Sequence, residues 1–377
     1  MLRRYLYPYI EQDLRSKMVF LGGPRQVGKT TLALTFLGSG NEKHPAYLNW
    51  DSLDAKQKIL RGELPSRQPL VIFDEIHKFA RWRNLIKGFY DTQKSTVSFL
   101  VTGSARLDYY RKGGDSLQGR YHYLRLHPFS LYEMNPKATE SDLSLLLKFG
   151  GFPEPLFKAE EKHWRRWQNE RLQRILVGDL RDLERVREVS MVQLLVESLP
   201  EKVGAPLSIK NLRDRLEVAH ESVSRWIEIL EHLYVVFRIP PFGSPKIRAV
   251  KKEQKLYFWD WSGVSEIGPR FENLVASHLL KYCHFLEDTE GYRMELRYLR
   301  DTDGREVDFV VLQGGVPLFA VECKSGERSA SPNAYYFRER TKIPKFYQVH
   351  LGNKDYGDEN TGVHVIPFRT FCQLLKL

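Results

Sequence analysis

The residues with the clearest chemical role lie near the start of the chain, where an apolar run passes through a glycine-rich turn into a helical pattern (MVFLGGPRQVGKTTLALTFL, 18–37). The segment Gly23–Thr30 fits the spacing G-x-x-x-x-G-K-[ST] of a phosphate-binding loop. In such a loop, backbone N–H groups at a helix N-terminus cradle phosphates, the lysine reaches the β- and γ-phosphates, and the hydroxyl ligates Mg²⁺. The pattern predicts ATP and Mg²⁺ as cofactors. We expect contacts with the nucleotide from Gly23, Pro24, Arg25, Gln26, Val27, Gly28, Lys29, Thr30 and Thr31.

A second chemical signal is PLVIFDEIHKF (69–79), an apolar strand that ends in two adjacent acids. Asp74 is expected to hold the water shell of Mg²⁺, and Glu75 to polarise the water that attacks the γ-phosphate. The alternative is a strand capped by solvated carboxylates. A phosphate-binding loop earlier in the same chain favours the catalytic interpretation.

A third apolar run, VSFLVTGSAR (97–106), places two hydroxyls at its end. Ligands bind at the C-terminal ends of strands in open parallel α/β sheets. Either Thr102 or Ser104 could therefore sense the γ-phosphate, and Ser104 is the residue that we assign to this catalytic role.

A charged pair near the C-terminus predicts a second site. In FAVECKSG (319–326) the side chains of a strand alternate between two faces, so Glu322 and Lys324 share one face while Phe319, Val321 and Cys323 take the other. The same period of two in EVDFVV (306–311) turns Asp308 away from its apolar neighbours. Two strands can thus direct Asp308, Glu322 and Lys324 at one spot. The alternative is an exposed ion pair on an edge strand.

The elements that position these residues suggest a family for the front of the chain. The chain resembles bacterial and archaeal AAA-type ATPases with a C-terminal domain, in the segments GGPRQVGKTT, VIFDEIHKF, VTGSAR, LQGR, HPFSLYEM and GGFPEPLF. The resemblance spans the whole chain. It implies a parallel sheet for the core and a small helical lid, containing GGFPEP, beside the nucleotide.

The resemblance also implies a role for Arg120, which lies before the predicted strand in SLQGRYHYLRLHPFSLYEM (116–134). An arginine at this point would act across a subunit interface, where a planar, permanent cation stabilises the developing phosphate charge. The alternative is an arginine bound to a local carboxylate. The first interpretation requires a homo-oligomer, with a hexamer as one candidate size.

The C-terminal pattern, a helix followed by three or more strands, resembles the PD-(D/E)xK nuclease fold, including relatives that resolve Holliday junctions. The resemblance implies that Asp308 and Glu322 ligate Mg²⁺, that Lys324 orients the attacking water, and that Glu272 on the helix GPRFENLVASHLLKYC (268–283) completes the cluster. One departure is that EVD replaces the Pro-Asp of the name. Because the same fold can serve as a DNA-binding platform, cleavage does not follow from the fold.

The middle of the chain predicts a winged helix. In PLSIKNLRDRLEVAHESVSRWIEILEHLYVVFRIPPF (206–242), two helical patterns precede an apolar strand; Ser208 can cap the first, and Val223, Trp226, Ile227 and Leu230 of the second would face the core. Basic residues follow in SPKIRAVKKEQK (244–255), including Lys255, and could form a wing. Winged helices also serve as spacers, and a basic run can be a solvated face. We expect phosphate and shape contacts with DNA from Arg225, Lys246, Arg248, Lys251 and Lys252.

Length and charge agree with a DNA-associated protein. The chain has 377 residues and a formal net charge of +11, which favours a polyanionic partner because Lys and Arg release counterions from nucleic acid. A membrane surface is the competing partner, but no apolar run approaches the roughly 18 residues of a spanning helix, and the first ten residues lack an apolar signal core. We therefore expect a cytoplasmic protein without membrane association. Three widely spaced cysteines argue against a disulfide framework or a thiolate zinc site.

The predicted fold class is α/β. It combines an AAA-type core, a helical lid, a winged helix and a C-terminal domain of the restriction-endonuclease type, with boundaries at 1–127, 128–190, 191–262 and 263–377. The leading hypothesis for function is an oligomeric Mg·ATP-dependent ATPase that binds branched or otherwise structured DNA and remodels or processes it. Two alternatives remain open: an ATP-gated, metal-dependent DNA endonuclease, and a nucleotide-dependent switch in signalling or defence that binds protein.

Overall fold

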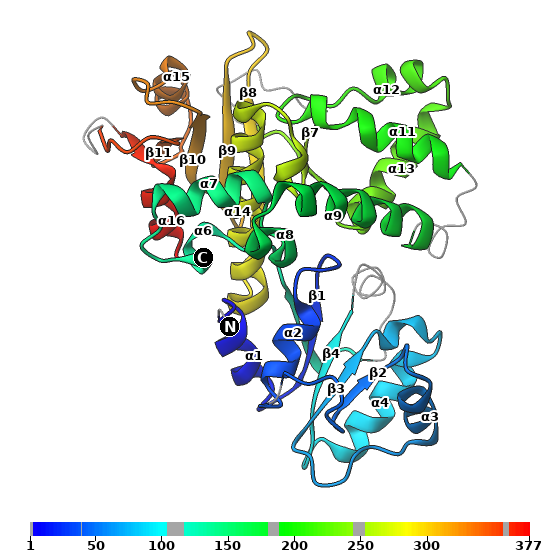
Figure 1. Cartoon of the computed structure of the whole chain (residues 1–377). Coiled ribbons are helices and arrows are strands. Elements are labelled where there is room, and N and C mark those ends of the chain that lie inside the picture. Colours follow the sequence, from blue (N-terminus) through cyan, green and yellow to red (C-terminus); the bar gives the residue numbers. More distant parts are fainter. Residues whose placement is uncertain (1–2, 39, 104–116, 180–187, 244–252, 357–361) are drawn as a thin grey trace. The chain divides into compact units, whose positions relative to one another are not determined.

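The computed structural model describes six stretches of the chain, residues 3–38, 40–103, 117–179, 188–243, 253–356 and 362–377. The chain divides into two compact units, Met1–His127 and Pro128–Leu377. Figure 1 shows the helices and strands of each unit, coloured along the sequence. The first unit is built on a parallel sheet, and the second joins a group of helices to a mixed sheet.

The first unit has five parallel strands in the order β2-β3-β4-β1-β5. β1 and β3 are buried along their whole length, as expected for parallel strands that are covered on both faces. In the core, Phe73 stacks with Phe89 and Phe99. The elements are α1 (Tyr7–Asp13), β1 (Met18–Gly22), α2 (Lys29–Thr35), β2 (Tyr47–Asn49), α3 (Leu53–Arg61), β3 (Leu70–Asp74), the 3₁₀ turn η1 (Ile76–Lys78), α4 (Trp82–Gln93), β4 (Ser98–Thr102) and β5 (Tyr121–Arg125).

The second unit begins with helices and one short antiparallel pair of strands, β6 and β7. Ser208 caps α12 by accepting a hydrogen bond from the Asn211 N–H at 3.2 Å, which confirms the predicted cap. The four apolar residues of α13 that were expected to face the core are buried. The elements are α6 (Leu131–Met134), α7 (Glu140–Phe149), α8 (Pro153–Lys158), α9 (Glu161–Gln173), the π-helical turn η3 (Arg174–Asp179), α11 (Val189–Ser198), the 3₁₀ turn η4 (Pro200–Lys202), α12 (Ile209–Leu216), α13 (His220–His232), β6 (Val236–Ile239) and β7 (Lys255–Phe258).

The remainder of the second unit is a five-stranded mixed sheet in the order β12-β11-β10-β9-β8. β8, β9 and β10 are antiparallel, whereas β10, β11 and β12 are parallel. The long helix α14 packs against β7, β8, β9 and β10. The elements are the 3₁₀ turn η5 (Trp261–Gly263), α14 (Ile267–Glu290), β8 (Met294–Arg300), β9 (Glu306–Gln313), β10 (Val316–Lys324), α15 (Pro332–Arg340), β11 (Phe346–His350), β12 (Val363–Pro367) and α16 (Phe368–Leu375).

Both faces of this sheet are covered, which changes the environment of the charged residues. β10 has a neighbour on each side and Glu322 is only 5% exposed, so the alternative of an exposed pair on an edge strand is wrong. On the face of Ala320, the side chain of Phe337 from α15 closes an apolar cluster. On the opposite face, Phe319 contacts Phe371 of α16. Asp308, on the neighbouring strand β9, is buried as well, with 9% of its surface exposed.

The helices that follow Pro128 are bound to the C-terminal part of the chain by polar contacts as well as packing. The Lys281 ammonium on α14 donates to the Pro128 carbonyl at 3.2 Å and pairs with Glu133 at 2.5 Å. The indole N–H of Trp261 donates to the Leu146 carbonyl at 2.9 Å. The stretch expected to form a lid is thus part of the same compact unit as the C-terminal sheet, and its role beside a nucleotide stays a prediction.

In the described parts of the chain, no helix is both long and apolar enough to cross a lipid bilayer.

Candidate functional site

The glycine-rich turn between β1 and α2 is shaped by its backbone. Gly23 has a φ of 133°, and a Cβ at this position would lie 2.4 Å from the Leu126 carbonyl oxygen. Gly28 has a φ of 96° and forms the N-cap of α2. Both values are in a region that side chains other than hydrogen disfavour. The predicted loop, Gly23–Thr31, therefore leads into a helix N-terminus, where backbone N–H groups can bind phosphates.

Lys29 and Arg4 brace this loop. Lys29 is 8% exposed, and its ammonium donates to the carbonyls of Gly23 at 2.9 Å and Pro24 at 2.6 Å. The buried Arg4 guanidinium donates to the Val27 carbonyl at 2.8 Å and to the His127 carbonyl at 2.5 Å. Arg4 was not predicted. It fixes the tip of the loop to the end of the first unit.

The Asp74 carboxylate is the centre of the site. It stands at the C-terminal end of β3 and is 4% exposed. The Thr30 hydroxyl donates to its Oδ2 at 2.8 Å, and the Tyr47 hydroxyl donates to the same atom at 2.6 Å. The Thr102 hydroxyl donates to Oδ1 at 2.5 Å. Residues of the loop and of the neighbouring strands β2 and β4 thus converge on one acid of β3.

Thr102 and Ser104 were the two hydroxyls that could sense the γ-phosphate, and the structure describes only Thr102. Thr102 is fully buried and bonded to Asp74, so it positions the acid. Ser104 lies outside the described residues.

Burial and the negative charge of Asp74 raise the pKa of Tyr47 well above its usual value, so the Tyr47 hydroxyl remains a hydrogen-bond donor at physiological pH.

Glu75 follows β3 directly and has a left-handed backbone, with a φ of 57°. Its carboxylate lies 3.4 Å from the Lys78 ammonium and 3.6 Å from Nε2 of the buried His77. Lys78 also pairs with Asp51 at 2.5 Å. With 21% of its side chain exposed, Glu75 can reach solvent beside the loop.

Arg120 makes the local ion pair that the alternative interpretation expected. Its Nε donates to Asp91 Oδ1 at 2.8 Å, and a terminal nitrogen donates to Oδ2 at 3.2 Å. This pair lowers the pKa of the Asp91 carboxyl, chiefly through the hydrogen bond from Arg120. A role for Arg120 across a subunit interface stays a prediction.

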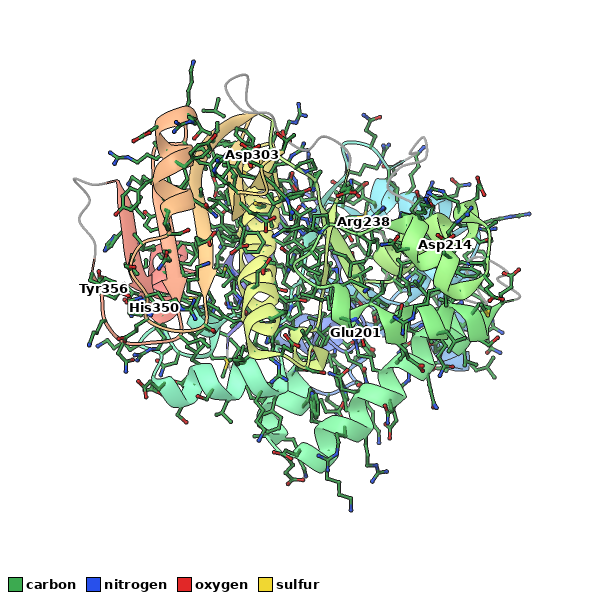
Figure 2. All side chains as sticks on the ribbon, turned by 90° about the horizontal axis from the view of Figure 1, so that it is seen from above. Glu201, Asp214, Arg238, Asp303, His350 and Tyr356 are labelled. Atoms are coloured by element: carbon green, nitrogen blue, oxygen red, sulfur yellow. The ribbon has the colours of Figure 1, made fainter. Side chains whose placement is uncertain are left out.

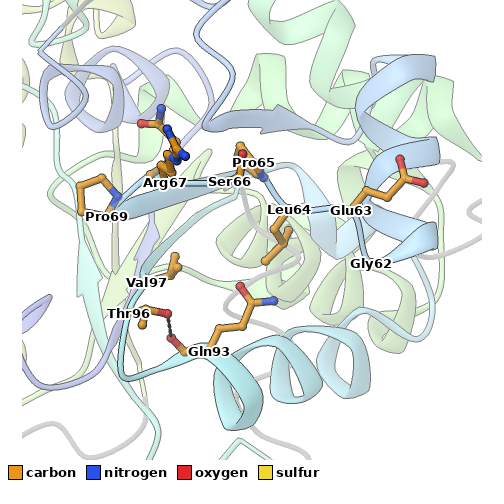
Figure 3. A pocket seen from close by; sticks show the side chains of 11 residues that line it. Gly62, Glu63, Leu64, Pro65, Ser66, Arg67, Pro69, Gln93, Thr96 and Val97 are labelled. Atoms are coloured by element: carbon orange, nitrogen blue, oxygen red, sulfur yellow. Dashed lines mark hydrogen bonds between the residues drawn. The ribbon is translucent and has the colours of Figure 1, made fainter.

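A separate hollow in the first unit lies at the other ends of the strands. Its volume is about 530 Å³, and it is lined by the segment Gly62–Pro69 together with Gln93, Thr96 and Val97, as Figure 3 shows. β3 starts at Leu70 and β4 at Ser98, directly after these linings. The hollow is therefore remote from Asp74, which ends β3.

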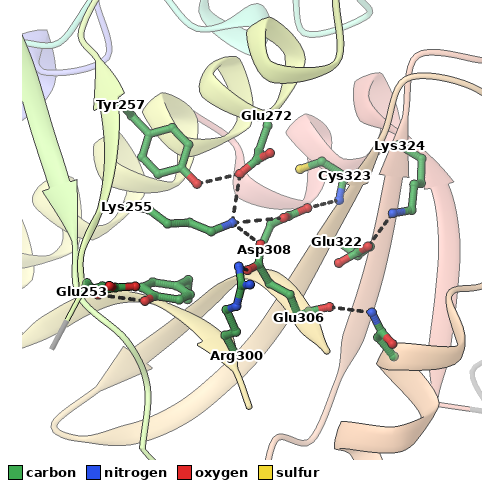
Figure 4. Close-up of polar contacts among 12 residues, drawn as sticks. Glu253, Lys255, Tyr257, Glu272, Arg300, Glu306, Asp308, Glu322, Cys323 and Lys324 are labelled. Carbon is green, nitrogen blue, oxygen red and sulfur yellow. Dashed lines mark hydrogen bonds and ion pairs between the residues drawn. The ribbon is translucent and has the colours of Figure 1, made fainter. Parts of the chain in front are cut away.

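In the second unit the structure brings together the four residues predicted for a nuclease-like site (Figure 4). The Cys323 N–H donates to Asp308 Oδ2 at 2.8 Å, and Lys324 pairs with Glu322 Oε1 at 2.6 Å. Burial, followed by the negative charge of Asp308, raises the pKa of Glu322 to about 8. The same two causes raise the pKa of Glu272 to about 7.

Lys255 corrects one prediction in this cluster. It was expected in the basic wing, but it begins β7 and its side chain is fully buried. Its ammonium lies 3.3 Å from Glu272 Oε1 and 3.5 Å from Asp308 Oδ1, and it also pairs with Glu306.

Within the described parts of the chain, no group of three or more His, Cys, Asp or Glu residues is arranged to hold a metal ion.

Comparisons with known proteins support an AAA-type fold for the first unit. A family model described as an AAA domain matches residues 15–135. Two models described as domains of unknown function, DUF8612 and DUF4143, match residues 140–265 and 267–371. Residues 15–135 thus match an AAA domain, and this stretch is called the AAA domain below. In this domain the loop lies between β1 and α2, Asp74 ends β3 and Glu75 follows it, and their roles toward a nucleotide stay predictions.

The relatives found by sequence have no assigned function. The uncharacterized protein MJ1637 of Methanocaldococcus jannaschii is 24% identical over 99% of this chain and 88% of its own length. The uncharacterized Rv2008c of Mycobacterium tuberculosis is 24% identical over 65% of this chain and 55% of its own.

Solved structures give distant similarities. The Aeropyrum pernix ORC1 protein, determined in complex with DNA, is 14% identical, covering 72% of this chain and 90% of its own, with a TM-score of 0.33. The RuvB Holliday junction branch migration motor of Thermotoga maritima is 15% identical, covering 59% of this chain and 82% of its own, with a TM-score of 0.30.

The residues predicted to contact DNA are only partly described. Arg225 is exposed on α13, as expected. On the neighbouring helix α12, Arg213 pairs with Asp214 and Arg215 pairs with Glu201; the two acids are labelled in Figure 2. The basic residues of the expected wing lie outside the described residues, namely Lys246, Arg248, Lys251 and Lys252.

Proposed function

We propose that the AAA domain binds and hydrolyses Mg·ATP. The observation that carries this proposal is the meeting of Thr30, from the phosphate-binding loop, with Asp74 at 2.8 Å. A hydroxyl and a carboxylate at this separation, beside a lysine and a helix N-terminus, are the donors that suit a Mg²⁺ ion shared with phosphates. When bound, Mg²⁺ neutralises phosphate charge.

The residues of the chain take distinct roles in this proposal. Backbone N–H groups of the loop and the Lys29 ammonium bind the phosphates, which requires Lys29 to exchange its bonds to the Gly23 and Pro24 carbonyls for phosphate oxygens. Tyr47 and Thr102 hold Asp74 in one orientation. Glu75 orients and deprotonates the attacking water, a contribution of about 10²–10⁴-fold for a general base.

Arg120 is proposed to act on the nucleotide of a neighbouring subunit. It is partly exposed, with 32% of its side chain accessible, and two nitrogens of its guanidinium already donate to the Asp91 carboxylate. Exchange of one planar, bidentate partner for another requires no change of geometry in the guanidinium. The proposal therefore includes a homo-oligomer in which Asp91 holds Arg120 until a neighbour's phosphates replace it.

We propose DNA as the partner of the second unit. The net charge of +11 favours a polyanion. Two helices, α12 and α13, followed by the antiparallel β6–β7 pair, match the element order of a winged helix. The succession of α14, three antiparallel strands, α15 and two parallel strands matches the element order of the nuclease-like fold. Together they form a surface for duplex or branched DNA.

One experiment separates these proposals. Wild-type protein, Lys29→Ala and Glu75→Gln are mixed with ATP, with duplex, single-stranded and four-way-junction DNA, and with increasing salt. We expect Lys29→Ala to lose nucleotide binding and Glu75→Gln to bind ATP with at least about a hundredfold slower turnover. DNA affinity should fall steeply with salt. Wild-type turnover by Glu75→Gln would refute its role, and absence of DNA binding in every mixture would favour a nucleotide-dependent switch that binds protein.

A further inference from the structure

The acidic cluster of the second unit contains its own cation. Lys255 has no exposed side-chain surface, and its ammonium has three N–H donors. Carboxylates lie within ion-pair distance on Glu272 of α14 and on Glu306 and Asp308 of β9. Figure 4 shows this ammonium among the acids. The donors of Lys255 and the acids around it are therefore matched in number.

The oxygens of these acids are also engaged by other donors of the chain. The Tyr257 hydroxyl donates to Glu272 Oε1 at 2.6 Å, the same atom that faces Lys255. Asp308 has Lys255 at Oδ1 and the Cys323 N–H at Oδ2. A divalent ion needs several carboxylate oxygens at about 2.0–2.6 Å. Here those oxygens already accept bonds from the protein.

The second carboxylate expected to bind metal has a cation of its own. Glu322 pairs with Lys324 at 2.6 Å. Glu306 is shared by Lys255 and Arg300, whose guanidinium lies 3.1 Å from Glu306 Oε2. Each acid in the cluster thus lies within ion-pair distance of a lysine or an arginine of the same chain.

The backbone position of Lys255 is set by the strand β7. Lys255 pairs with Ile239 in the β6–β7 ladder, so its backbone is fixed while its side chain ends inside the cluster. A divalent cation in the cluster would meet the Lys255 ammonium, which already lies within ion-pair distance of three carboxylates, as a like charge.

We propose that Lys255 is a resident cation whose buried ammonium replaces the divalent metal ion in the C-terminal cluster. The cluster is then complete without metal, and the C-terminal domain is a platform that binds DNA without cutting it. Lys255 also joins β7 to α14 and β9, so the hairpin next to α13 is anchored to the C-terminal sheet. The inference does not depend on ATP hydrolysis.

The test is to remove the resident cation and look for a metal site. Nucleotide-free, full-length wild type, Lys255→Ala and the double variant Lys255→Ala/Asp308→Asn are titrated with Mn²⁺ and followed by electron paramagnetic resonance and thermal unfolding. We expect Lys255→Ala to gain a Mn²⁺ site that the double variant lacks. At a Mn²⁺ concentration of a hundred times Kd, its unfolding midpoint should rise by about 5–10 °C. Wild type should show neither change.

Lys281→Ala is the matched control. Lys281 is also buried, on α14, and it pairs with the carboxylate of Glu133, outside the C-terminal cluster. We expect this variant to be destabilised without rescue by Mn²⁺, because one carboxylate does not make a metal site. Rescue of Lys281→Ala as well would overturn the assignment, since it would show that Mn²⁺ acts outside the cluster.

If Lys255→Ala does not fold, wild type and Asp308→Asn still test whether the cluster binds a metal ion. Binding of Mn²⁺ to nucleotide-free wild type that disappears in Asp308→Asn would overturn the proposal. So would Mg²⁺- or Mn²⁺-dependent cutting of a four-way junction that disappears in the same variant. The expected result is DNA retention of equal strength with and without divalent ions, and no difference in Mn²⁺ binding between wild type and Asp308→Asn.

Discussion

The role of Tyr47 can be tested by removing one oxygen atom. In Tyr47→Phe the Asp74 carboxylate loses the hydrogen bond at 2.6 Å but keeps those from Thr30 and Thr102. A hydrogen bond to a charged group contributes about 1.5–3 kcal/mol. Because both oxygens of Asp74 remain paired, the lower value applies. A loss of about 1.5 kcal/mol corresponds to roughly a tenfold decrease in kcat/KM.

The assay is steady-state ATP hydrolysis at several Mg²⁺ concentrations. We expect the defect in Tyr47→Phe to be largest at limiting Mg²⁺, because a less restrained Asp74 holds the ion more weakly. Tyr257→Phe is the control: it removes a hydroxyl that donates to a carboxylate, Glu272, at the same 2.6 Å, but outside the AAA domain. Its ATP turnover should be unchanged. The reasoning fails if Tyr47→Phe keeps the wild-type rate and Mg²⁺ dependence, or if both variants lose turnover equally.

Two further predictions concern pH and assembly. His278 is buried and accepts the Leu131 N–H at 3.0 Å; burial lowers its pKa to about 3, below the usual 6.5, so the folded state binds fewer protons and the contribution of His278 to stability falls as pH decreases below 6.5. The raised pKa values of Glu272 and Glu322 act in the opposite direction, so the measured quantity is the difference in urea unfolding between wild type and His278→Gln. Between pH 7 and 5 the wild type should lose on the order of 2 kcal/mol relative to the variant, and equal pH dependence of the two proteins would contradict the assignment. For assembly, Arg120→Ala should lower turnover by about 10³-fold, whereas Asp91→Ala should not. Mixing Arg120→Ala with Lys29→Ala should restore activity, and a mixture no faster than its components would exclude action between subunits.

Local patterns predicted the parts of both sites that follow from strand and loop geometry. The spacing around Lys29 can be read directly, because a phosphate-binding loop is a contiguous segment. Asp308 and Glu322 were expected on one face because side chains alternate along a strand. The pairing of Val310 with Ala320 in the β9–β10 ladder aligns these two acids across the sheet.

The missed residues depend on contacts between distant segments. Lys255 stands in a run of basic residues, and charge runs usually mark solvated surface; only the pairing of β7 near α14 and β9 reveals that it is buried among acids. Tyr47 precedes Asp74 by 27 residues, and Arg4 precedes His127 by 123. No periodicity connects such positions. The sequence carried no signal for Tyr47, because the alignment of β2 with β3 is known only from the structure.

Buried cations bind the main chain on both sides of the boundary between the two units. The His127 carbonyl receives the buried guanidinium of Arg4 within the AAA domain, and the Pro128 carbonyl receives the buried ammonium of Lys281 within the second unit. The proline ring also fixes φ at this point. Each unit therefore orders its own side of the boundary between residues 127 and 128 with a cation that it buries itself, so the two carbonyls depend on separate sets of contacts.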